Sequence, residues 1–504
     1  MTITETTGQE SAEFPPEQYA PGPNGPEVRA RVPFAMSEPG LVPKQRYYDR
    51  EFFELEKKNL WPRTWQMAAR LEEIPNPGDY SEYEVVGNSI LIIRQQDGSV
   101  KALHNACRHR GMKLAAECGN ARAEGFICPF HGWRWNMDGQ NTFVWGKHLF
   151  SDEAVDAAQL ALPPCRVELW GGCAFINFDD NAAPLLDYIG PLAERLDPHN
   201  VDQLRYEWRH EVELAANWKL AMEAFMEGMH VMRTHPQLHQ TMLPGMERYA
   251  NPPRRDAPPQ LVSMTSREAV DKLVEMHALR SEGMGGMVHA NDMAVMRDIK
   301  DKVELPDDPR QAVMHFNRAL NDEIVKRGRA SGKPIPDLNE RADDPAPLRR
   351  FAFPNLFMLT QFANVISYRI RPLTAESCLF EVGSLIFYPS DEKRPRTGPA
   401  KRMAYDDPDH PLVTKQDFSN IPRQQEGLHV SGFVEMRLSR AVEGLISNYQ
   451  RLLDGFLAGL GEEQLVEASR IVSAGVDWPI EDIGFGPAPA EVVGIEKFSP
   501  VPKL

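Results

Sequence analysis

Two short stretches, CRHRG at 107–111 and CPFHGW at 128–133, decide how the first half of this chain folds. They contain a Cys-x-His and, eighteen residues later, a Cys-x-x-His, with four candidate ligands: Cys107, His109, Cys128 and His131. Two Cys and two His can bind one zinc ion. They can also hold a [2Fe–2S] cluster in which two imidazoles replace two thiolates on one iron. Each stretch supplies one thiolate and one imidazole at a turn between predicted strands, which favours the cluster.

This pair of stretches resembles the Rieske motif of ring-hydroxylating oxygenases. Rieske proteins of the respiratory type carry an additional Cys in each loop, and those two Cys form a disulfide. Met112 and Phe130 stand at those places here, which is similar to the soluble oxygenase type. The resemblance implies one [2Fe–2S] cluster per chain, bound by Cys107, His109, Cys128 and His131.

Length and charge exclude several other classes of protein. The chain has 504 residues, which predicts two or three domains. Its net charge of −16 argues against binding to nucleic acid or to anionic membranes. It contains no apolar run of transmembrane length, and its acidic N-terminus lacks the pattern of a signal peptide. A cytoplasmic protein is therefore expected.

The sequence texture predicts an arm followed by a β domain. Residues 1–44 are rich in Pro, Gly and Glu and are expected to form an extended N-terminal arm. Residues 45–180 begin with an amphipathic helix at 48–60 and continue with short apolar strands separated by turns. The strands are expected at 80–86, 89–96, 99–107 and 173–178. This antiparallel β segment holds both cluster stretches and is predicted to be the Rieske domain.

Residues 181–504 mix helical and strand patterns, so the predicted fold class is α+β. Helices are expected at 187–196, 218–233, 267–279, 309–327 and 421–460, and strands at 356–362, 365–373 and 378–389. The resemblance implies a catalytic domain of the helix-grip (START-like) type, a curved antiparallel sheet wrapped on a long helix. The segment 281–296 is rich in Gly and Met, which predicts a mobile flap over an apolar pocket. Ordinary core packing is the alternative for its Met residues.

The stretch NWKLAMEAFMEGMHVMRTHP at 217–236 carries a second candidate metal site. His230 and His235 stand five residues apart, whereas a spacing of four places side chains on one helix face. Pro236 disfavours helix at the residue before it, so the His235 imidazole is expected to turn back towards His230. Two imidazoles and one carboxylate form the facial triad of non-haem Fe(II) oxygenases. A helix end with incidental histidines is the alternative for this pair alone.

The same stretch resembles the catalytic-domain signature of ring-hydroxylating oxygenases, in which NWK precedes a Glu and an acid-x-x-His-x4-His pattern. The stretch TKQDFSNIPRQQEGL at 414–428 resembles the segment that supplies the carboxylate ligand in that family. The resemblance implies one Fe²⁺ per chain, bound by His230, His235 and Asp417.

Glu227 is the predicted catalytic residue beside these ligands. It precedes His230 by three residues and is expected to share its helix face. In most relatives an Asp stands here and hydrogen-bonds one iron-ligating His and one cluster-ligating His of a neighbouring subunit. Some amine-oxidising members of the family carry Glu, as this chain does. Ala224 is a second departure, because many dioxygenases have Asn at that place.

The resemblance implies a terminal oxygenase component, the large (alpha) subunit of its system. The first prediction is cis-dihydroxylation of an aromatic ring, because the second-domain signature resembles large subunits of aromatic-ring dioxygenases. The alternative is monooxygenation of a bulky apolar or aromatic substrate, by hydroxylation or by O- or N-demethylation, which Glu227 favours. A non-catalytic Rieske electron carrier is a further alternative, but it needs only the first domain.

The resemblance also implies partners. The chain has no flavin or nicotinamide motif, so electrons are expected from a separate NAD(P)H-dependent reductase, with or without a ferredoxin. Dioxygen and a small aromatic or apolar molecule are the expected substrates. Cluster and iron of one chain lie far apart in this family, which implies a head-to-tail homotrimer. A small beta subunit is also compatible with the resemblance.

Overall fold

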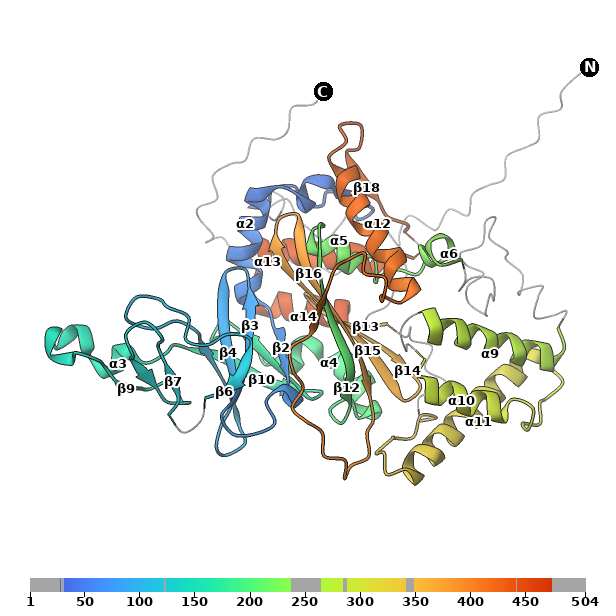
Figure 1. The fold of residues 1–504 in the computed structure, drawn as a ribbon. Coiled ribbons are helices and arrows are strands. Elements are labelled where there is room, and N and C mark those ends of the chain that lie inside the picture. Colours follow the sequence, from blue (N-terminus) through green and yellow to red (C-terminus); the bar gives the residue numbers. More distant parts are fainter. Residues whose placement is uncertain are drawn as a thin grey trace, which may run out of the picture.

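The computed structural model describes residues 28, 31–121, 124–236, 264–283, 288–340, 349–440 and 442–473. Most of the predicted arm 1–44 and the centre of the predicted flap, 284–287, lie outside these residues. Within them, no helix is both long enough and apolar enough to cross a membrane. Figure 1 shows two sheet-containing parts beside each other, with a group of helices at the opposite end from the small β elements.

The first part is built on a seven-stranded sheet in which every pairing is antiparallel. Its order is β2-β11-β10-β5-β4-β3-β6, with β2 Gln66–Arg70, β3 Asp79–Val85, β4 Asn88–Arg94, β5 Val100–His104, β6 Cys118–Asn120, β10 Pro164–Trp170 and β11 Cys173–Asn177. Val86 and Gly87 join β3 to β4 with positive φ values of 42° and 83°, which suit the twist of a two-residue hairpin. All four strands predicted in this part are confirmed.

A smaller three-stranded sheet carries the cluster end of this part. It consists of β7 Phe126–Ile127, β8 Arg134–Trp135 and β9 Asn141–Phe143. The Trp135 side chain is fully buried, and its Nε1 donates to the carbonyl of Leu160 at the end of α3, Ala157–Leu160. This small sheet has its own hydrophobic cluster, separate from the main core.

The second part contains a six-stranded sheet in the order β13-β14-β15-β16-β12-β17. The strands are β12 Arg205–Leu214, β13 Arg349–Ala352, β14 Leu356–Gln361, β15 Asn364–Thr374, β16 Ser377–Ile386 and β17 Lys401–Met403. Only β17 pairs in parallel, with β12. Helix α13, Gly444–Leu457, has every residue buried, and Tyr449 on it packs against the rings of Phe351 and Phe353. The α+β prediction is confirmed.

Three further helices lie together beyond the edge of this sheet. They are α9 Ser266–Gly283, α10 Ala290–Ile299 and α11 Pro309–Ala330 (Figure 1). The predicted flap is wrong for its C-terminal half, because α10 is a regular helix with Met293 and Met296 buried. Burial of these two Met holds the segment against its neighbours, so the core-packing alternative describes them.

The predicted long helix at 218–233 is wrong. Helix α5 covers Trp218–Glu223 and the short α6 covers Val231–Thr234, with turns between them. The carboxylate of Glu227 accepts hydrogen bonds from the backbone N–H groups of Met229 and His230. Because these N–H groups donate to the carboxylate, they cannot donate to the backbone carbonyls of a continuous helix. A side chain that caps the start of a helix binds backbone N–H groups in the same way.

The predicted helix at 421–460 is also wrong, because it consists of three elements. Helix α12 covers Leu412–Leu428, strand β18 covers Glu435–Arg437, and α13 follows. Strand β18 pairs antiparallel with β1, Leu41–Pro43, from the end of the predicted arm. Because β18 pairs with a segment that is distant in the sequence, the residues around 435–437 carry no local pattern that predicts the strand.

Residues at the start of the predicted Rieske domain pack on the second part. The Tyr47 hydroxyl donates to the carboxylate of Glu223 at 2.9 Å. Helix α2, Arg50–Asn59, places Glu56 2.5 Å from the ammonium of Lys219, and both side chains are fully buried. These contacts place the helix of 48–60 beside the second part, not beside the cluster.

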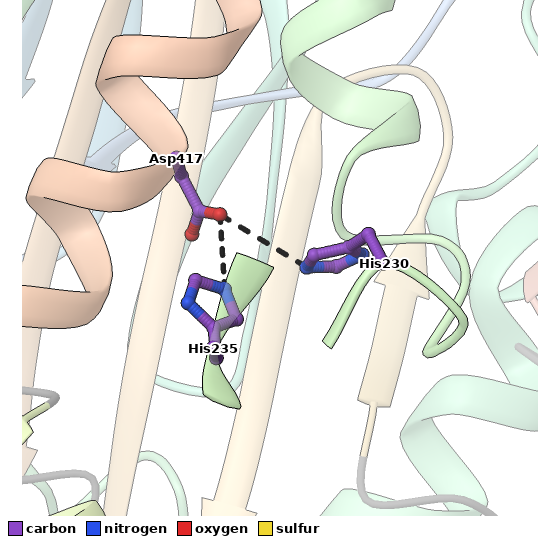
Figure 2. A group of neighbouring side chains, drawn as sticks. All are labelled: His230, His235 and Asp417. Atoms are coloured by element: carbon purple, nitrogen blue, oxygen red, sulfur yellow. Dashed lines mark ion pairs between the residues drawn. The ribbon is translucent and has the colours of Figure 1, made fainter. Parts of the chain in front are cut away.

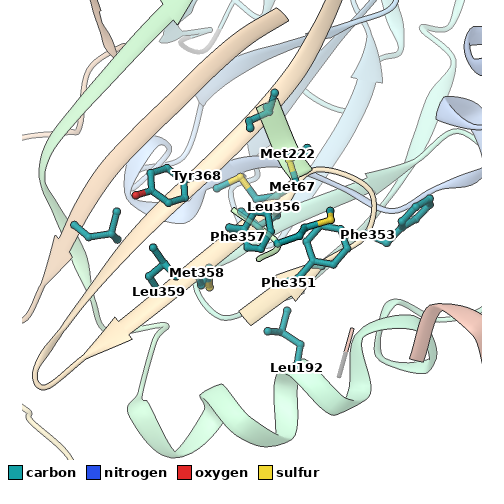
Figure 3. Close-up of a cluster of buried hydrophobic side chains, with 14 of the residues drawn as sticks. Met67, Leu192, Met222, Phe351, Phe353, Leu356, Phe357, Met358, Leu359 and Tyr368 are labelled. Atoms are coloured by element: carbon teal, nitrogen blue, oxygen red, sulfur yellow. The ribbon is translucent and has the colours of Figure 1, made fainter. Parts of the chain in front are cut away.

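One hydrophobic core runs through both parts. Figure 3 shows Met67 of β2 among Met222, Phe351, Phe357 and Tyr368 of the second part. Buried ion pairs accompany it: Arg369 contacts Glu381 at 2.8 Å and also donates to the carbonyl of Ala68 at 2.8 Å. Because a buried charge is costly without its partners, the hydrogen bond from Arg369 to Ala68 holds β2 of the first part against the second part.

Candidate active site

The two cluster loops have the same backbone hydrogen bonds. In the first loop, the N–H of Gly111 donates to the carbonyl of Cys107 at 2.9 Å, and the N–H of Cys107 donates to the carbonyl of Met112 at 2.8 Å. In the second loop, Gly132 and Cys128 repeat this arrangement at 3.0 and 2.8 Å, with Trp133 as the last acceptor. Both Gly have positive φ, 78° and 71°, which a residue with a side chain rarely adopts.

These loops bring the four predicted cluster ligands together. Cys107 and Cys128 are buried, and the imidazole rings of His109 and His131 lie 4.5 Å apart. The ring of His109 stacks on Trp133 at 4.7 Å, and its buried Nδ1 has no hydrogen-bond partner. Buried polar atoms are normally paired, so a ligand at Nδ1 is the expected explanation.

The spacing of the four side chains argues against a single zinc ion. Ligand atoms of a single ion lie close to one another. In the described structure, no three ligand atoms of Cys107, His109, Cys128 and His131 all lie within 4.8 Å of one another. Burial raises the pKa of the Cys107 thiol, as does neighbouring Cys128, whereas the backbone N–H groups of His109 and Arg110 lower it. The donor set fits a two-iron cluster.

The second site is formed by His230, His235 and Asp417, whose ligand atoms lie within 4.8 Å of one another (Figure 2). Oδ1 of Asp417 lies 3.0 Å from Nε2 of His235 and 4.0 Å from Nε2 of His230. The two histidines flank α6, and the carboxylate comes from α12. His235 and Asp417 are buried, whereas His230 is a quarter exposed. Two imidazoles and one carboxylate suit Fe²⁺ with positions left open.

The Nδ1 atom of each of these histidines faces an oxygen. Nδ1 of His230 lies 2.6 Å from Oε1 of Glu227, and Nδ1 of His235 lies 2.8 Å from Oε1 of Gln416. Burial would raise the pKa of Glu227, but the hydrogen bond with His230 and backbone N–H groups lower it. Each ring therefore directs Nε2 at the shared site, an arrangement typical of metal-ligating histidines. The sequence predicts that Glu227 lies beside His230, although on a helix face. No motif marks Gln416, so its contact with His235 was not predicted.

A cavity of about 580 Å³ opens beside this site. Glu227, His230 and Asp417 line it, together with the segment 432–438 around β18. Glu223, Glu435 and Glu443 also line it, next to the cation of Arg437 and several apolar side chains. It therefore offers a route from the surface to Glu227 and His230.

Family models match both parts of the chain. The model "Rieske [2Fe-2S] domain" matches residues 64–144. The model "Ring hydroxylating alpha subunit (catalytic domain)" matches residues 201–459, more than half of the chain. The chain belongs to the ring-hydroxylating alpha-subunit family. These two matches imply one [2Fe–2S] cluster and one Fe²⁺ for this alpha subunit, and both donor sets described above fit them.

Curated relatives of this alpha subunit include two kinds of oxygenase. The glycine betaine monooxygenase oxygenase subunit of Pseudomonas aeruginosa is 30% identical over 40% of this chain and 46% of its own length. The carnitine monooxygenase oxygenase subunit of Acinetobacter baumannii is 33% identical over 38% and 52%. The large oxygenase component of the 2,4-dinitrotoluene dioxygenase system of Burkholderia sp. is 36% identical over 40% and 46%. The chain spans about half the length of the curated relatives it matches.

Solved structures share the fold of this alpha subunit. Naphthalene 1,2-dioxygenase matches with a TM-score of 0.58 at 22% identity, covering 88% of this chain and 98% of that one. A quaternary ammonium Rieske monooxygenase with bound L-carnitine matches with a TM-score of 0.53 at 19% identity, covering 83% and 96%. These similarities show that most of the chain shares its fold with both structures.

Proposed function

We propose that this chain is the terminal oxygenase component of a Rieske oxygenase system and acts as a monooxygenase. The observation that carries the proposal is the convergence of His230, His235 and Asp417 within 4.8 Å in a chain that also holds a cluster motif. When bound, the cluster supplies single electrons, and the mononuclear Fe²⁺ supplies the centre at which dioxygen is reduced. A free-standing electron carrier would need only the cluster and no second metal site.

Each predicted site residue has a role in this proposal. Cys107, Cys128, His109 and His131 hold the cluster, and His230, His235 and Asp417 hold the Fe²⁺. Glu227 orients His230 through the 2.6 Å contact at Nδ1 and keeps its lowered pKa, so it stays anionic at neutral pH. It also lines the cavity, which lets it contact a group that enters from outside.

We infer that this group is the cluster end of a second copy, in a head-to-tail homotrimer. In Figure 1 the small β elements β7 and β9 lie at the opposite end of the molecule from α6. The cluster end presents Phe130 at 59% exposure, with the guanidinium of Arg110 5.3 Å from its ring. A basic and apolar tip complements a cavity whose wall combines apolar side chains with the carboxylates of Glu227 and Glu443, and charge complementarity steers association. Electrons would come from a separate NAD(P)H-dependent reductase, with or without a ferredoxin.

The names of the relatives favour monooxygenation over the first prediction of cis-dihydroxylation. Glycine betaine and carnitine monooxygenase subunits are among the matched relatives, and Glu227 agrees with the amine-oxidising alternative. Dihydroxylation remains the second candidate because the dinitrotoluene dioxygenase component is 36% identical over its matched part.

Turnover with labelled oxygen tests the proposal. The iron-loaded protein would be combined with a reductase, NADH, ¹⁸O₂ and candidate substrates, and the products analysed by mass spectrometry. Monooxygenation places one labelled atom in the product or releases formaldehyde from an N-methyl group. Two labelled atoms would establish dihydroxylation instead, and substrate conversion by His230→Ala at the wild-type rate would refute both.

A further inference from the structure

Arg280, in the last turn of α9, carries a positive charge that no carboxylate among the described residues neutralises. Throughout the described residues, no carboxylate forms an ion pair with its guanidinium, and its side chain is only partly exposed. Loss of hydration lowers the pKa of Arg280 to about 10, and no acidic side chain opposes that effect. It is still cationic at neutral pH. A poorly hydrated, unpaired cation is costly unless an anion joins it.

The neighbours of Arg280 place it on the inner side of α9. His277, one helical turn earlier, is buried, and its ring lies 5.1 Å from that of Phe362. Burial, and then the charge of Arg280, lower the pKa of His277 to about 3. The guanidinium therefore lies near His277, on the side of α9 that faces the turn between β14 and β15.

That side of α9 leads to the candidate iron site. A Cβ added to Gly283, at the end of α9, would lie 3.3 Å from Cγ2 of Val413 on α12. Val413 precedes Asp417 by four residues, so the two share one face of α12. Arg280 is thus one helical turn from the point where α9 meets α12, and that point is one turn from Asp417.

Other polar atoms near the β14–β15 turn are buried without partners. Among the described residues these atoms are Nδ1 of His277, Oδ2 of Asp292 and Oε1 of Gln361. Asp292 lies at Ala363, whose N–H it accepts, and burial raises its pKa to about 6. Arg280 is not among the charges that act on Asp292, so the two do not pair. Native proteins satisfy nearly all such atoms with protein groups, water or ligand.

We propose that Arg280 binds the carboxylate of an organic-acid substrate whose other end reaches the iron site. The inference rests on the proposed function and adds a substrate class to it. A guanidinium offers two parallel N–H donors that match the two oxygens of a carboxylate. The orphaned atoms of His277, Asp292 and Gln361 can then hydrogen-bond the substrate's remaining polar groups or its water.

Equilibrium binding to the iron-loaded protein tests this inference without turnover. The probes are matched pairs that differ in the carboxylate: glycine betaine with choline, and 2-naphthoate with 2-naphthamide, with L-carnitine as a further acid. Isothermal titration is expected to show at least one acid binding about tenfold or more tightly than its counterpart without the carboxylate, because the counterpart cannot form charge-assisted hydrogen bonds with the guanidinium. Arg280→Gln is expected to remove that preference, and Arg280→Lys to retain part of it.

Arg297→Gln is the matched control, because Arg297 is an exposed arginine on the neighbouring helix α10. Iron content and circular dichroism of each variant verify that the fold is intact. Equal binding of each acid and its counterpart without the carboxylate, an unchanged preference in Arg280→Gln, or binding by none of the acids would overturn the inference. If the acids bind as expected but no oxygen is consumed with them, the proposed function fails and the anion site stands.

Discussion

The side-chain oxygen of Gln416 lies 2.8 Å from Nδ1 of His235, while Oδ1 of the adjacent Asp417 lies 3.0 Å from Nε2 of the same ring. Two consecutive residues of α12 thus contact both nitrogens of one imidazole. Because an amide oxygen can only accept, Gln416 favours the tautomer with the proton on Nδ1 and leaves Nε2 free to bind a metal. Gln416 is therefore a positioning residue of the candidate iron site.

Replacing Gln416 by Ala should weaken iron binding about 10- to 100-fold, the usual effect of losing a partner of a ligating His. Competition with a chromophoric Fe²⁺ chelator measures this affinity directly. Gln424→Ala is the control, because Gln424 is exposed on the same helix and contacts neither histidine in the described structure. Equal iron affinities of the two variants would contradict the positioning role.

Asp417→Ala should remove the mononuclear iron and leave the cluster, so iron content should fall from about three to about two per chain. The visible absorption of the cluster should not change, because its predicted ligands lie in the other part of the molecule. Asp409→Ala serves as the comparison, since Asp409 is an exposed acid in the loop before α12. Loss of the cluster spectrum in Asp417→Ala would instead indicate a general folding defect.

Glu227→Ala should lower kcat on the order of 100-fold with little change in KM, because His230 loses its orienting partner and the substrate loses no contact. Glu227→Gln retains an acceptor oxygen without the charge and should fall between the wild type and Ala. Stopped-flow absorbance of a pre-reduced cluster, mixed with oxygen and substrate, isolates electron transfer from product release. A raised KM at unchanged kcat would assign Glu227 to substrate binding instead.

His131→Cys should lower the reduction potential of the cluster by on the order of 100 mV or more, towards the range of all-thiolate clusters. The reason is that a neutral imidazole is replaced by an anionic thiolate, which stabilises the oxidised state. Spectroelectrochemical titration of the visible bands gives the potential. A variant that retains both irons of the cluster at an unchanged reduction potential would show that His131 is not a ligand.

Glu223→Gln should make the protein's stability less dependent on pH. Burial raises the pKa of Glu223 from 4.5 to about 7, partly opposed by hydrogen bonds from Gln450 and Tyr47. A raised folded-state pKa means that this stability contribution is complete below pH 4.5 and is lost as pH rises through about 7. The loss is on the order of 3 kcal/mol.

The Tm of the wild type should therefore fall relative to that of Glu223→Gln between pH 5 and pH 8. Differential scanning fluorimetry of both proteins in parallel buffers measures the difference. Parallel Tm profiles over this range would mean that Glu223 does not titrate there.

The cluster loops were predictable because their requirements are local. Gly111 and Gly132 have the positive φ that each tight turn needs, four residues after the Cys whose carbonyl they contact. The strands within 80–107 were equally predictable, because the alternation of apolar and polar residues indicates which face of the sheet is buried. The break in the predicted helix 218–233 could not be predicted from the sequence, because it arises where the carboxylate of Glu227 competes with the helix for backbone N–H groups.

The sequence by itself determined which residues are candidates for the chemistry: the two Cys-His stretches, the His pair before Pro236, and a downstream carboxylate. Only the tertiary structure decided that Asp417, 182 residues after His235, comes within 3.0 Å of it, and that Gln416 holds the ring's other nitrogen. It also decided that Arg280, at the inner side of α9, has no ion-pair partner in the part of the chain that the structure describes. The physical reason is that ligand types and turns are properties of short segments, whereas distances and unpaired charges depend on how distant segments pack.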